Sequence, residues 1–464
     1  MEVPQPPKKK SRLTLFILIA LVLGIALGFV LNTTYMDPVN AQLESIDGII
    51  KETQLQKSLP GDTTALVAQL KKLAVERNAI LAKRDKMVEP FSILADIFLR
   101  LIKMIVAPLV FSTLVVGVAK LGDIKAVGRI GGKTLLWFVC ASLMSLLLGM
   151  VMVNLFRPGE TMHLPLPSAD AASGIASVGF SLKNFLYHIF PASAVEAMAN
   201  NEILQIVVFS LFFGVATAAL GEGGKIIITF FDAVAHVILK VTGYVMNVAP
   251  LAVFGAMTAV IAKQGIGILK TYSIFISEFY FSLIILWCLL LFAGFLVIGK
   301  RIYQLIRRVK EPTLLAFSTA SSEAAFPKTM EELQRFGAKD KIVSFVLPLG
   351  YSFNLDGSMM YMTFASLFIA QSYGMHIAIG TQFWMLLTLM LTSKGIAGVP
   401  RASLVVIAGT LSTFGIPEAG LALLLGIDPL LDMGRSATNV VGNSVATAVV
   451  SKWEGALGED SKEI

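Results

Sequence analysis

The amino-acid sequence predicts an all-α polytopic membrane protein. Of its 464 residues, 55% are apolar and only 15% are charged, whereas about a quarter of the residues are charged in ordinary soluble domains. The mean hydropathy is +0.75, and long apolar runs separated by short polar turns continue from Phe91 almost to the end of the chain. Because a helix satisfies its own backbone hydrogen bonds in lipid, we expect these runs to be helical spans.

The N-terminal part predicts one span followed by a large polar insertion. The basic run Lys8–Arg12 precedes an apolar run that begins at Leu13 and lacks a small-residue cleavage site, so we expect a retained span at residues 13–32 rather than a signal peptide. The positive-inside rule then places residues 1–12 in the cytoplasm. In the polar stretch 33–90, leucines at helical spacing among lysines and arginines predict a solvated helical insertion outside the membrane.

Residues 91–310 predict further spans with few residues that point to a binding or catalytic site. The 4 histidines of the chain are scattered without metal-ligand spacing, so no metal site is expected from them. The net charge of +7 comes from basic residues at span ends and in a loop, without interleaved aromatic residues, which disfavours nucleic acid as a partner. The 2 cysteines lie in apolar runs and imply no disulfide framework. The expected helices are Phe91–Leu121, Lys133–Phe156, Asn201–Leu220, Lys225–Ala262 and Leu269–Ile306.

Two similar breaks interrupt the apolar runs after residue 311. Each combines serine with a later proline: Ser318–Glu323 is followed by Pro327, and Leu391–Gly395 is followed by Pro400. Each break lies in an apolar stretch and precedes a helix, which is the pattern of paired re-entrant hairpins from an inverted repeat. Plain surface loops are the alternative interpretation.

An unwound turn is predicted between these breaks, in the stretch Phe345–Gln371. Its centre carries Asn354, Asp356 and Gly357. An aspartate in mid-span is costly, and the glycine permits the helix to unwind. Backbone carbonyls then join the Asn and Asp oxygens in a cage that suits Na⁺. The alternative is a glycine kink with a satisfied aspartate.

The last apolar segment, Gly426–Val450, carries a polar face. At roughly 100° per residue its polar side chains share one arc about 100° wide, and leucines and valines occupy the rest of the surface. Polar residues in a span normally face a protein interior or a water-filled cavity. We therefore expect the wall of a binding site for something small and charged, the alternative being an Asp/Arg pair that only ties helices together. The arc consists of Asp428, Asp432, Arg435, Ser436, Asn439 and Asn443.

Four motifs in this region resemble those of the dicarboxylate/amino acid:cation symporter family of glutamate and aspartate transporters. Their residues are most similar to those of the bacterial proton/glutamate symporters of this family. The motifs are SSEAAFPKTM, LPLGYSFNLDGS, TSKGIAGVP and DMGRSATNVVGN, and the resemblance covers the chain from about Phe91 to Glu454. It implies an elevator-type transporter fold with eight transmembrane helices and two re-entrant hairpins, assembled as a homotrimer in the lipid of the bacterial inner membrane. It places the remaining scaffold helices and transport-domain helices 3 and 6 in residues 91–310, the core transport domain in 311–452 and a C-terminal tail in 453–464.

The resemblance also implies roles for individual residues. Arg435 grips the side-chain carboxylate of the substrate, which suits its planar fork of donors, and Asp432 takes the α-ammonium group. The other residues implied at the substrate site are Asn439, Ser436, Ser321, Ser322 and Gly398. Those implied at the cation site are Asp356, Asn354, Gly350, Ser352, Ser393 and Asn443, with a possible Na⁺ at Asp356 and Asn354.

Asp432 favours acidic amino acids over plain dicarboxylates. C4-dicarboxylate carriers of this family share the SSE and TSKG motifs but lack this aspartate, because their substrate has no ammonium group. A buried carboxylate beside a dianionic substrate is repulsive. We therefore expect an importer of L-glutamate and L-aspartate, with transport of succinate, fumarate and malate as the alternative.

Two departures from the family pattern concern the coupling ion. Sodium-coupled members place a carboxylate where this chain has Asn443, and a hydroxyl where it has Ala141, next to Ser142. Each change removes a cation ligand or its charge, so we expect proton coupling. Sodium coupling stays the alternative because Asp356 and Asn354 remain. The candidate proton carriers are Glu323, Asp356 and Asp428, since a carboxylate in a dry site takes up a proton more readily than one in water. No cofactor is expected.

Two other classes of function fit the motifs less well. A membrane-embedded enzyme needs a nucleophile with a base or a set of metal-ligand histidines, and none of the four motifs contains a histidine. A channel has no need of an Arg/Asp pair suited to a zwitterion.

Overall fold

The computed structural model describes residues 13–57, 64–121, 124–162, 166, 187, 189–264, 272–393, 402–425 and 427–459. Helices dominate these residues, and the one β-type pairing among them is an isolated bridge between Ala338 and Leu457. The predicted all-α class is confirmed. Among the described helices, 5 are long and apolar enough to cross a membrane, as expected of a multi-pass protein. The count of eight spans, the re-entrant hairpins and the elevator arrangement stay predictions. The 5 helices are Leu15–Met36, Ala65–Ala119, Lys125–Thr161, Gly221–Met246 and Ser273–Ile298.

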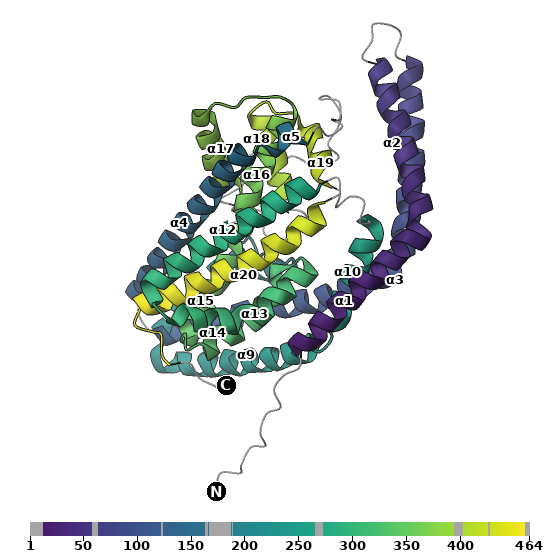
Figure 1. The fold of residues 1–464 in the computed structure, drawn as a ribbon. Helices are drawn as coiled ribbons and strands as arrows, with labels where there is room; N and C mark the ends of the chain where they lie inside the picture. Colours follow the sequence, from purple (N-terminus) through teal and green to yellow (C-terminus); the bar gives the residue numbers. More distant parts are fainter. Residues whose placement is uncertain are drawn as a thin grey trace.

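The chain begins with a span and a projecting helical arm. The first helix continues through a π-helical turn into α2, and α3 runs back along α2 before it enters the body of the protein (Figure 1). A 2.6 Å ion pair between Arg77 and Asp47 links the two helices of the arm. The described part of the expected polar insertion is thus helical, and its extracytoplasmic location stays a prediction. The elements are α1 (Leu13–Leu31), η1 (Asn32–Met36), α2 (Asp37–Lys57) and α3 (Thr64–Leu121).

The middle of the chain packs around α3. Helix α10 lies between α3 and α1, and α8 and α9 contact α3 as well. Gly24 and Gly28 of α1 face the backbone of α10 so closely that a Cβ at either position would overlap it, and these glycines therefore let the two helices approach. The elements are α4 (Ile124–Phe156), α5 (Pro158–Thr161), α7 (Ala194–Ala199), α8 (Ile203–Ala219), η2 (Gly221–Gly224), α9 (Lys225–Met246), α10 (Ala249–Gln264) and α12 (Ser273–Ile298).

Two helices that were expected to be continuous are divided in the structure. The expected helix Lys225–Ala262 separates into α9 and α10, because Pro250 lacks an amide hydrogen and fits the first turn of a helix better than its interior. The expected helix Leu269–Ile306 ends at Gly299, whose φ of 60° is open to glycine and strained for other residues. The first helix after this glycine therefore begins at Arg301, ten residues before the expected domain boundary at 311.

The C-terminal part consists of packed helix pairs around one central helix, α20. Ser321 caps α14 at the first predicted break, where the left-handed Ala320 (φ 48°) turns the chain between α13 and α14. The second break continues into residues 394–401, outside the described residues. The elements are α13 (Arg301–Thr319), α14 (Ser322–Arg335), α15 (Asp340–Phe353), α16 (Asp356–Ser372), α17 (Ile379–Thr392), α18 (Ala402–Thr413), η4 (Glu418–Leu421), α19 (Ala422–Leu425) and α20 (Asp428–Trp453).

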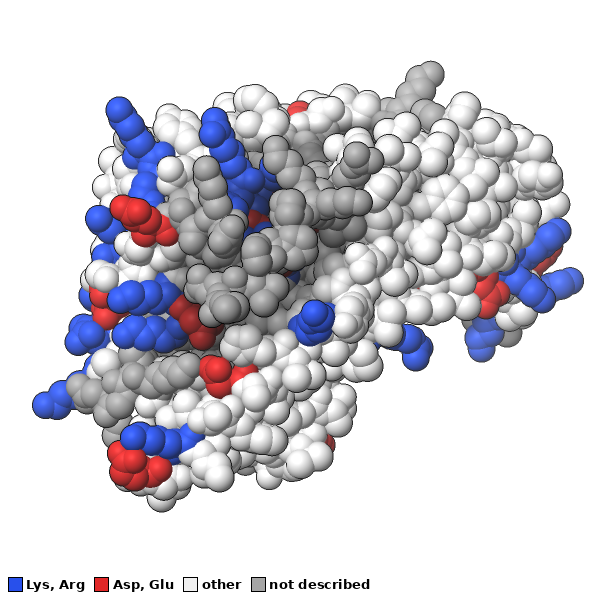
Figure 2. All heavy atoms as spheres, turned by 90° about the horizontal axis from the view of Figure 1, so that it is seen from below, with Lys and Arg blue, Asp and Glu red and all other residues white. Residues whose placement is uncertain are grey.

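Helix α20 belongs to both large hydrophobic clusters of the protein. Its valines, such as Val440 and Val445, belong to the cluster that also contains residues of α3, α13, α14 and α15, whereas Leu431 belongs to the cluster with residues of α4, α12 and α16. Seen from below, uncharged side chains form a broad area between two groups of Lys, Arg, Asp and Glu, one on the left side and one at the right end (Figure 2). Most of the polar side chains of α20, such as Arg435, Asn439 and Asn443, are buried inside the protein.

Two ion pairs tie the C-terminal end of α20 to α4. The buried Glu454 carboxylate lies 2.9 Å from Arg129 Nη2 and 2.6 Å from Lys133 Nζ. Hydrogen bonding by the Arg129 guanidinium, with a further contribution from Lys133, holds the pKa of Glu454 below its ordinary value. The chain end is also fixed to the turn after α14, since Lys339 N donates to Ala456 O at 3.0 Å.

Candidate functional site

The polar face of α20 lies against an interruption between two helices. Helix α15 ends at Phe353 and α16 begins at Asp356, with Asn354 (φ −124°, ψ 68°) and Leu355 (φ −98°, ψ 65°) outside helical geometry. The predicted unwound turn is present. Gly357, however, lies inside α16 rather than at the break, and its role is close approach, because a Cβ there would overlap the backbone of Arg435.

Buried amide and carboxylate groups meet beneath this break. Asn354 Nδ2 donates to Asp356 Oδ2 at 2.9 Å and to Asn443 Oδ1 at 3.2 Å, which joins the break to α20. Ser145 of α4 places its hydroxyl oxygen 3.2 Å from Asp356 Oδ1 and 2.8 Å from Ala141 O. The side chains of Asn354, Asp356 and Asn443 are fully buried. We call Ser145, Asn354, Asp356 and Asn443 the Asp356 cluster.

Glycines make this approach possible. A Cβ at Gly442 of α20 would overlap the carboxylate of Asp356, and a Cβ at Gly350 of α15 would overlap the side-chain amide of Asn443. Gly350, predicted at the cation site, therefore lies at the cluster. Three buried polar atoms at or near it have no hydrogen-bond partner, namely Asn354 Oδ1, Asn443 Nδ2 and Ser352 Oγ. The oxygens among them and the Asp356 carboxylate are hard donors of the kind that bind small cations.

Asn439 holds the start of α16 from the neighbouring helix. Its Oδ1 accepts from Gly357 N at 2.9 Å and Ser358 N at 3.4 Å, and its Nδ2 donates to Ser358 Oγ at 3.3 Å. The first amides of a helix have no partner within the helix, and α16 has no side-chain cap of its own. Asn439 thus supplies the cap, and the start of α16 is fixed to α20.

Arg435 forms the second part of the site. Its Nη2 lies 3.0 Å from Asp428 Oδ1 and 2.9 Å from Asp432 Oδ1. Its guanidinium carbon lies 4.1 Å from the centre of the Tyr361 ring, and Tyr361 donates to Asp428 Oδ1 at 3.2 Å. The Arg435 side chain is only 2% exposed and that of Asp428 4%, whereas the Asp432 side chain is 39% exposed. Asp432 therefore lies at the entrance, with Arg435 and Asp428 behind it.

Half of the guanidinium fork is unused. The two ion pairs both involve Nη2, and Arg435 Nε and Nη1 are buried without a hydrogen-bond partner. Buried donors are normally satisfied. The Nε hydrogen points to the Nη2 side of the guanidinium, whereas Nη1 lies next to the aliphatic stem, so the two unpaired donors act singly. The arrangement can therefore receive a carboxylate oxygen in a charge-assisted hydrogen bond at either donor, while the carboxylate of Asp432 is accessible to a cation.

The remaining predicted residues lie at several places. Ser436 is buried on α20. Ser321 accepts from Ala324 N at 3.3 Å, and Ser322 opens α14. Among the described residues, no hydrogen bond or ion pair joins either serine to α20. Glu323, in the first turn of α14, interacts electrostatically with Lys103 of α3, and buried Ser393 follows α17, where its hydroxyl donates to Met390 O at 3.1 Å. Gly398 lies outside the described residues.

Sequence reasoning missed Tyr361, Ser145 and Ser358. Tyr361 lies on α16 within an apolar run rich in methionine, and Ser145 lies on α4 in a run of leucines, so neither has a polar neighbourhood in the sequence. Ser145 is one helical turn after Ala141, where a hydroxyl was expected to be missing. This spacing is the one signal that could have identified it.

Comparison with known proteins gives one family and two groups of relatives. Residues 13–453 match a family model described as the sodium:dicarboxylate symporter family. The proton/sodium-glutamate symport protein of Geobacillus stearothermophilus is 41% identical over 393 residues, which cover 84% of this chain and 93% of that protein. The C4-dicarboxylate transport protein of Bacillus subtilis is 40% identical over 375 residues, or 79% and 88% of the two chains. That of Laribacter hongkongensis is 40% identical over 372 residues, or 79% and 84%.

Proposed function

The chain belongs to the sodium:dicarboxylate symporter family, and from this premise we propose that it imports L-glutamate and L-aspartate by secondary active symport. As a member of this family it is a membrane transporter and not an enzyme. The observation that carries the choice of substrate is the 2.9 Å contact between Asp432 and Arg435 at the entrance of a buried site. An acidic amino acid presents the complementary pair of groups, an ammonium and a side-chain carboxylate.

Binding uses the unfilled donors of Arg435. The side-chain carboxylate of the substrate accepts a hydrogen bond from Nη1 or from Nε, both of which are buried and unpaired, and the ammonium group binds the accessible carboxylate of Asp432. Asp428 keeps its ion pair with Nη2 and holds the guanidinium in place. Before binding, the two aspartates and Arg435 carry a formal charge of −1 in total, and this charge favours a substrate with a cationic group. Ser436, Asn439, Ser321, Ser322 and Gly398 are proposed to complete the site.

The coupling ion is proposed to act at the Asp356 cluster. Asp356 is the first residue of α16, and the next two amides are held by Asn439. An ion or proton at Asp356 and a substrate at the α20 face therefore act on the same helix start. We assign proton coupling, with the proton on Asp356, Asp428 or Glu323, because Asn443 is uncharged and Ala141 has no hydroxyl. Sodium coupling is the second candidate, favoured by the unpaired Asn354 Oδ1 beside Asp356.

The wider arrangement follows the family resemblance. Residues 311–452 form the mobile transport domain and move against a trimeric scaffold in an elevator-type cycle, with the N-terminus in the cytoplasm of a bacterial cell. Packing of α20 into both hydrophobic clusters supports its place at the centre of the moving unit. Transport of C4-dicarboxylates is the second candidate for substrate, favoured by relatives of that name at 40% identity.

A competition panel in proteoliposomes tests the proposal. Uptake of labelled L-aspartate, driven by an inward proton gradient, is measured with unlabelled L-glutamate, succinate or malate, with and without sodium. We expect L-glutamate to compete and the dicarboxylates not to, and uptake to continue without sodium. Competition by succinate equal to that by L-glutamate would assign a dicarboxylate carrier, and uptake only in the presence of sodium would refute proton coupling.

A further inference from the structure

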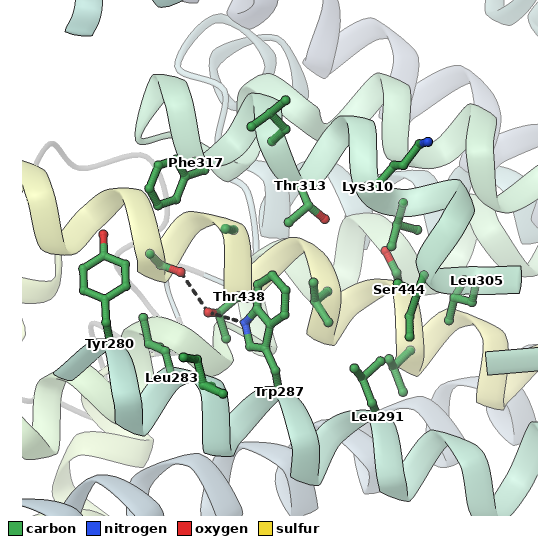
Figure 3. A pocket seen from close by; sticks show the side chains of 18 residues that line it. Tyr280, Leu283, Trp287, Leu291, Leu305, Lys310, Thr313, Phe317, Thr438 and Ser444 are labelled. Atoms are coloured by element: carbon green, nitrogen blue, oxygen red, sulfur yellow. Dashed lines mark hydrogen bonds between the residues drawn. The ribbon is translucent and has the colours of Figure 1, made fainter. Parts of the chain in front are cut away.

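A cavity of about 450 Å³ lies on the other side of α20, between α12 and α13 (Figure 3). At roughly 100° per residue, its lining residues Gly434, Ala437 and Val441 lie opposite the face that carries Asp432 and Arg435. The cavity is thus separate from the substrate site and shares only its helix. Its walls are Leu, Ile, Val, Phe and Trp side chains, with a few polar groups.

The cavity opens toward the surroundings of α12. Ile284 and Ile306, which line it, are 60% and 39% exposed. Helix α12 is apolar enough to span a membrane and leaves Phe292 and Leu296 largely exposed. An exposed apolar surface of this kind faces hydrocarbon, so the material that reaches the opening is the acyl region of the bilayer.

A cationic and aromatic stripe runs along α13 at the cavity's edge. Tyr303, Arg307 and Lys310 are exposed and follow each other at spacings of four and three residues, on one face of the helix. Tyrosine with Lys or Arg is typical of the membrane–water interface. Lys310 lines the cavity with its aliphatic stem and directs its ammonium away from the apolar centre (Figure 3). Among the described residues it has no ion-pair partner.

Thr313 lines the same cavity one turn further along α13. Its hydroxyl oxygen is buried, so the residue presents its carbon atoms to the cavity. At about 1.5 Å of rise per residue it lies about 4.5 Å from Lys310 along the helix. The cavity therefore has a cation at its edge and apolar walls beyond. An anionic glycerophospholipid presents a phosphate and an acyl chain in the same order.

We propose that this cavity binds one acyl chain of an anionic glycerophospholipid, with the phosphate at Lys310. Because an acyl chain leaves one apolar surrounding for another, its binding depends on van der Waals packing in the cavity, and a cation between helices at headgroup height selects anionic lipid. The bound chain contacts Thr438, whose hydroxyl accepts from Trp287 Nε1 at 2.8 Å and donates to Gly434 O at 2.8 Å. The lipid therefore packs against the helix that carries the proposed substrate site.

Native mass spectrometry of the purified protein tests the proposal directly. Phosphatidylglycerol and phosphatidylcholine are titrated onto delipidated wild type, Lys310→Ala and Leu291→Trp. Leu291 lines the cavity from α12 and is partly buried, so tryptophan there fills space that the acyl chain needs. The matched controls are Lys240→Ala, an exposed lysine on α9 away from the cavity, and Leu296→Trp, which is 69% exposed on α12 and does not line it.

We expect wild type and both controls to bind the first phosphatidylglycerol about fivefold more tightly than phosphatidylcholine, because one lysine near the surface contributes about 1 kcal/mol. Lys310→Ala should lose this preference, and Leu291→Trp should lose the first tight binding step for both lipids. Equal binding of the two lipids to wild type, or unchanged binding in both test variants, would overturn the proposal. The readout is independent of transport, so it is distinct from a failure of the proposed function.

Discussion

Replacing Gly442 by alanine tests whether Asp356 belongs to the coupling site. A Cβ at position 442 would overlap Asp356 Oδ2, the atom that accepts from Asn354 Nδ2 at 2.9 Å. Both residues are fully buried, so the carboxylate must move or α20 must shift. An added methyl group in a packed interior costs about 1–3 kcal/mol, and the hydrogen bond lost from the charged carboxylate contributes about as much. Where about 1–3 kcal/mol of this cost falls on the ion-loaded state, affinity for the coupling ion falls by about 5- to 150-fold.

The assay is initial uptake of L-aspartate into proteoliposomes, followed against external pH at fixed sodium and against sodium at fixed pH. We expect Gly442→Ala to need a higher concentration of the coupling ion for half-maximal uptake. The control is Gly434→Ala on the same helix, where the new Cβ would lie 2.7 Å from Leu283 Cδ1 and 3.0 Å from the Tyr280 ring, both outside the Asp356 cluster. If Gly442→Ala folds as the control does and keeps the ion dependence of wild type, Asp356 is not part of the coupling site.

Three further substitutions test other parts of the structure. Asp432→Ala should abolish L-aspartate uptake and reduce the difference between direct uptake of labelled L-glutamate and of labelled succinate; normal aspartate transport would show that the ammonium assignment is wrong. Arg435→Ala leaves Asp428 buried without its cation, so we expect thermal unfolding to show a loss of about 3–5 kcal/mol, with part of it recovered by adding Asp428→Asn. Because Arg129 holds the pKa of Glu454 below its unfolded value of about 4.3, the stabilisation is present above that pH and is lost as pH falls through the folded pKa. The difference in Tm between wild type and Glu454→Gln should therefore be constant from pH 6 to 8 and shrink in acid, and an unchanged difference at about pH 3.5 would contradict the role of this ion pair.

The sequence was most informative where all the residues of a predicted site lie on the same helix. Asp428, Asp432 and Arg435 are spaced to share a face of any helix that contains them, and the structure brings all three into one ion-paired group. The break at Asn354 was likewise visible, because an aspartate and a glycine in an apolar span are out of place.

Contacts between helices could not be read from spacing. Tyr361 stacks on Arg435 from another helix, and Ser145 approaches Asp356 across 211 positions of sequence. Gly357 was assigned to the unwound turn, yet it permits the close approach of α20. Helix ends at Gly299 and before Pro250 depend on single residues inside long apolar runs, where hydrophobic periodicity carries no boundary signal.

The cap that Asn439 provides for α16 has a consequence for the two proposed sites. Its Oδ1 holds two amides at 2.9 and 3.4 Å, and its Nδ2, which donates to Ser358 Oγ, has a second hydrogen that can donate to a substrate carboxylate. One side chain can therefore contact the substrate and the start of α16 at the same time. Asp356 is the first residue of that helix, so a shift of Asn439 on substrate binding would also move the backbone that aims the Asp356 carboxylate. The proposed substrate and cation sites are thus linked through one amide.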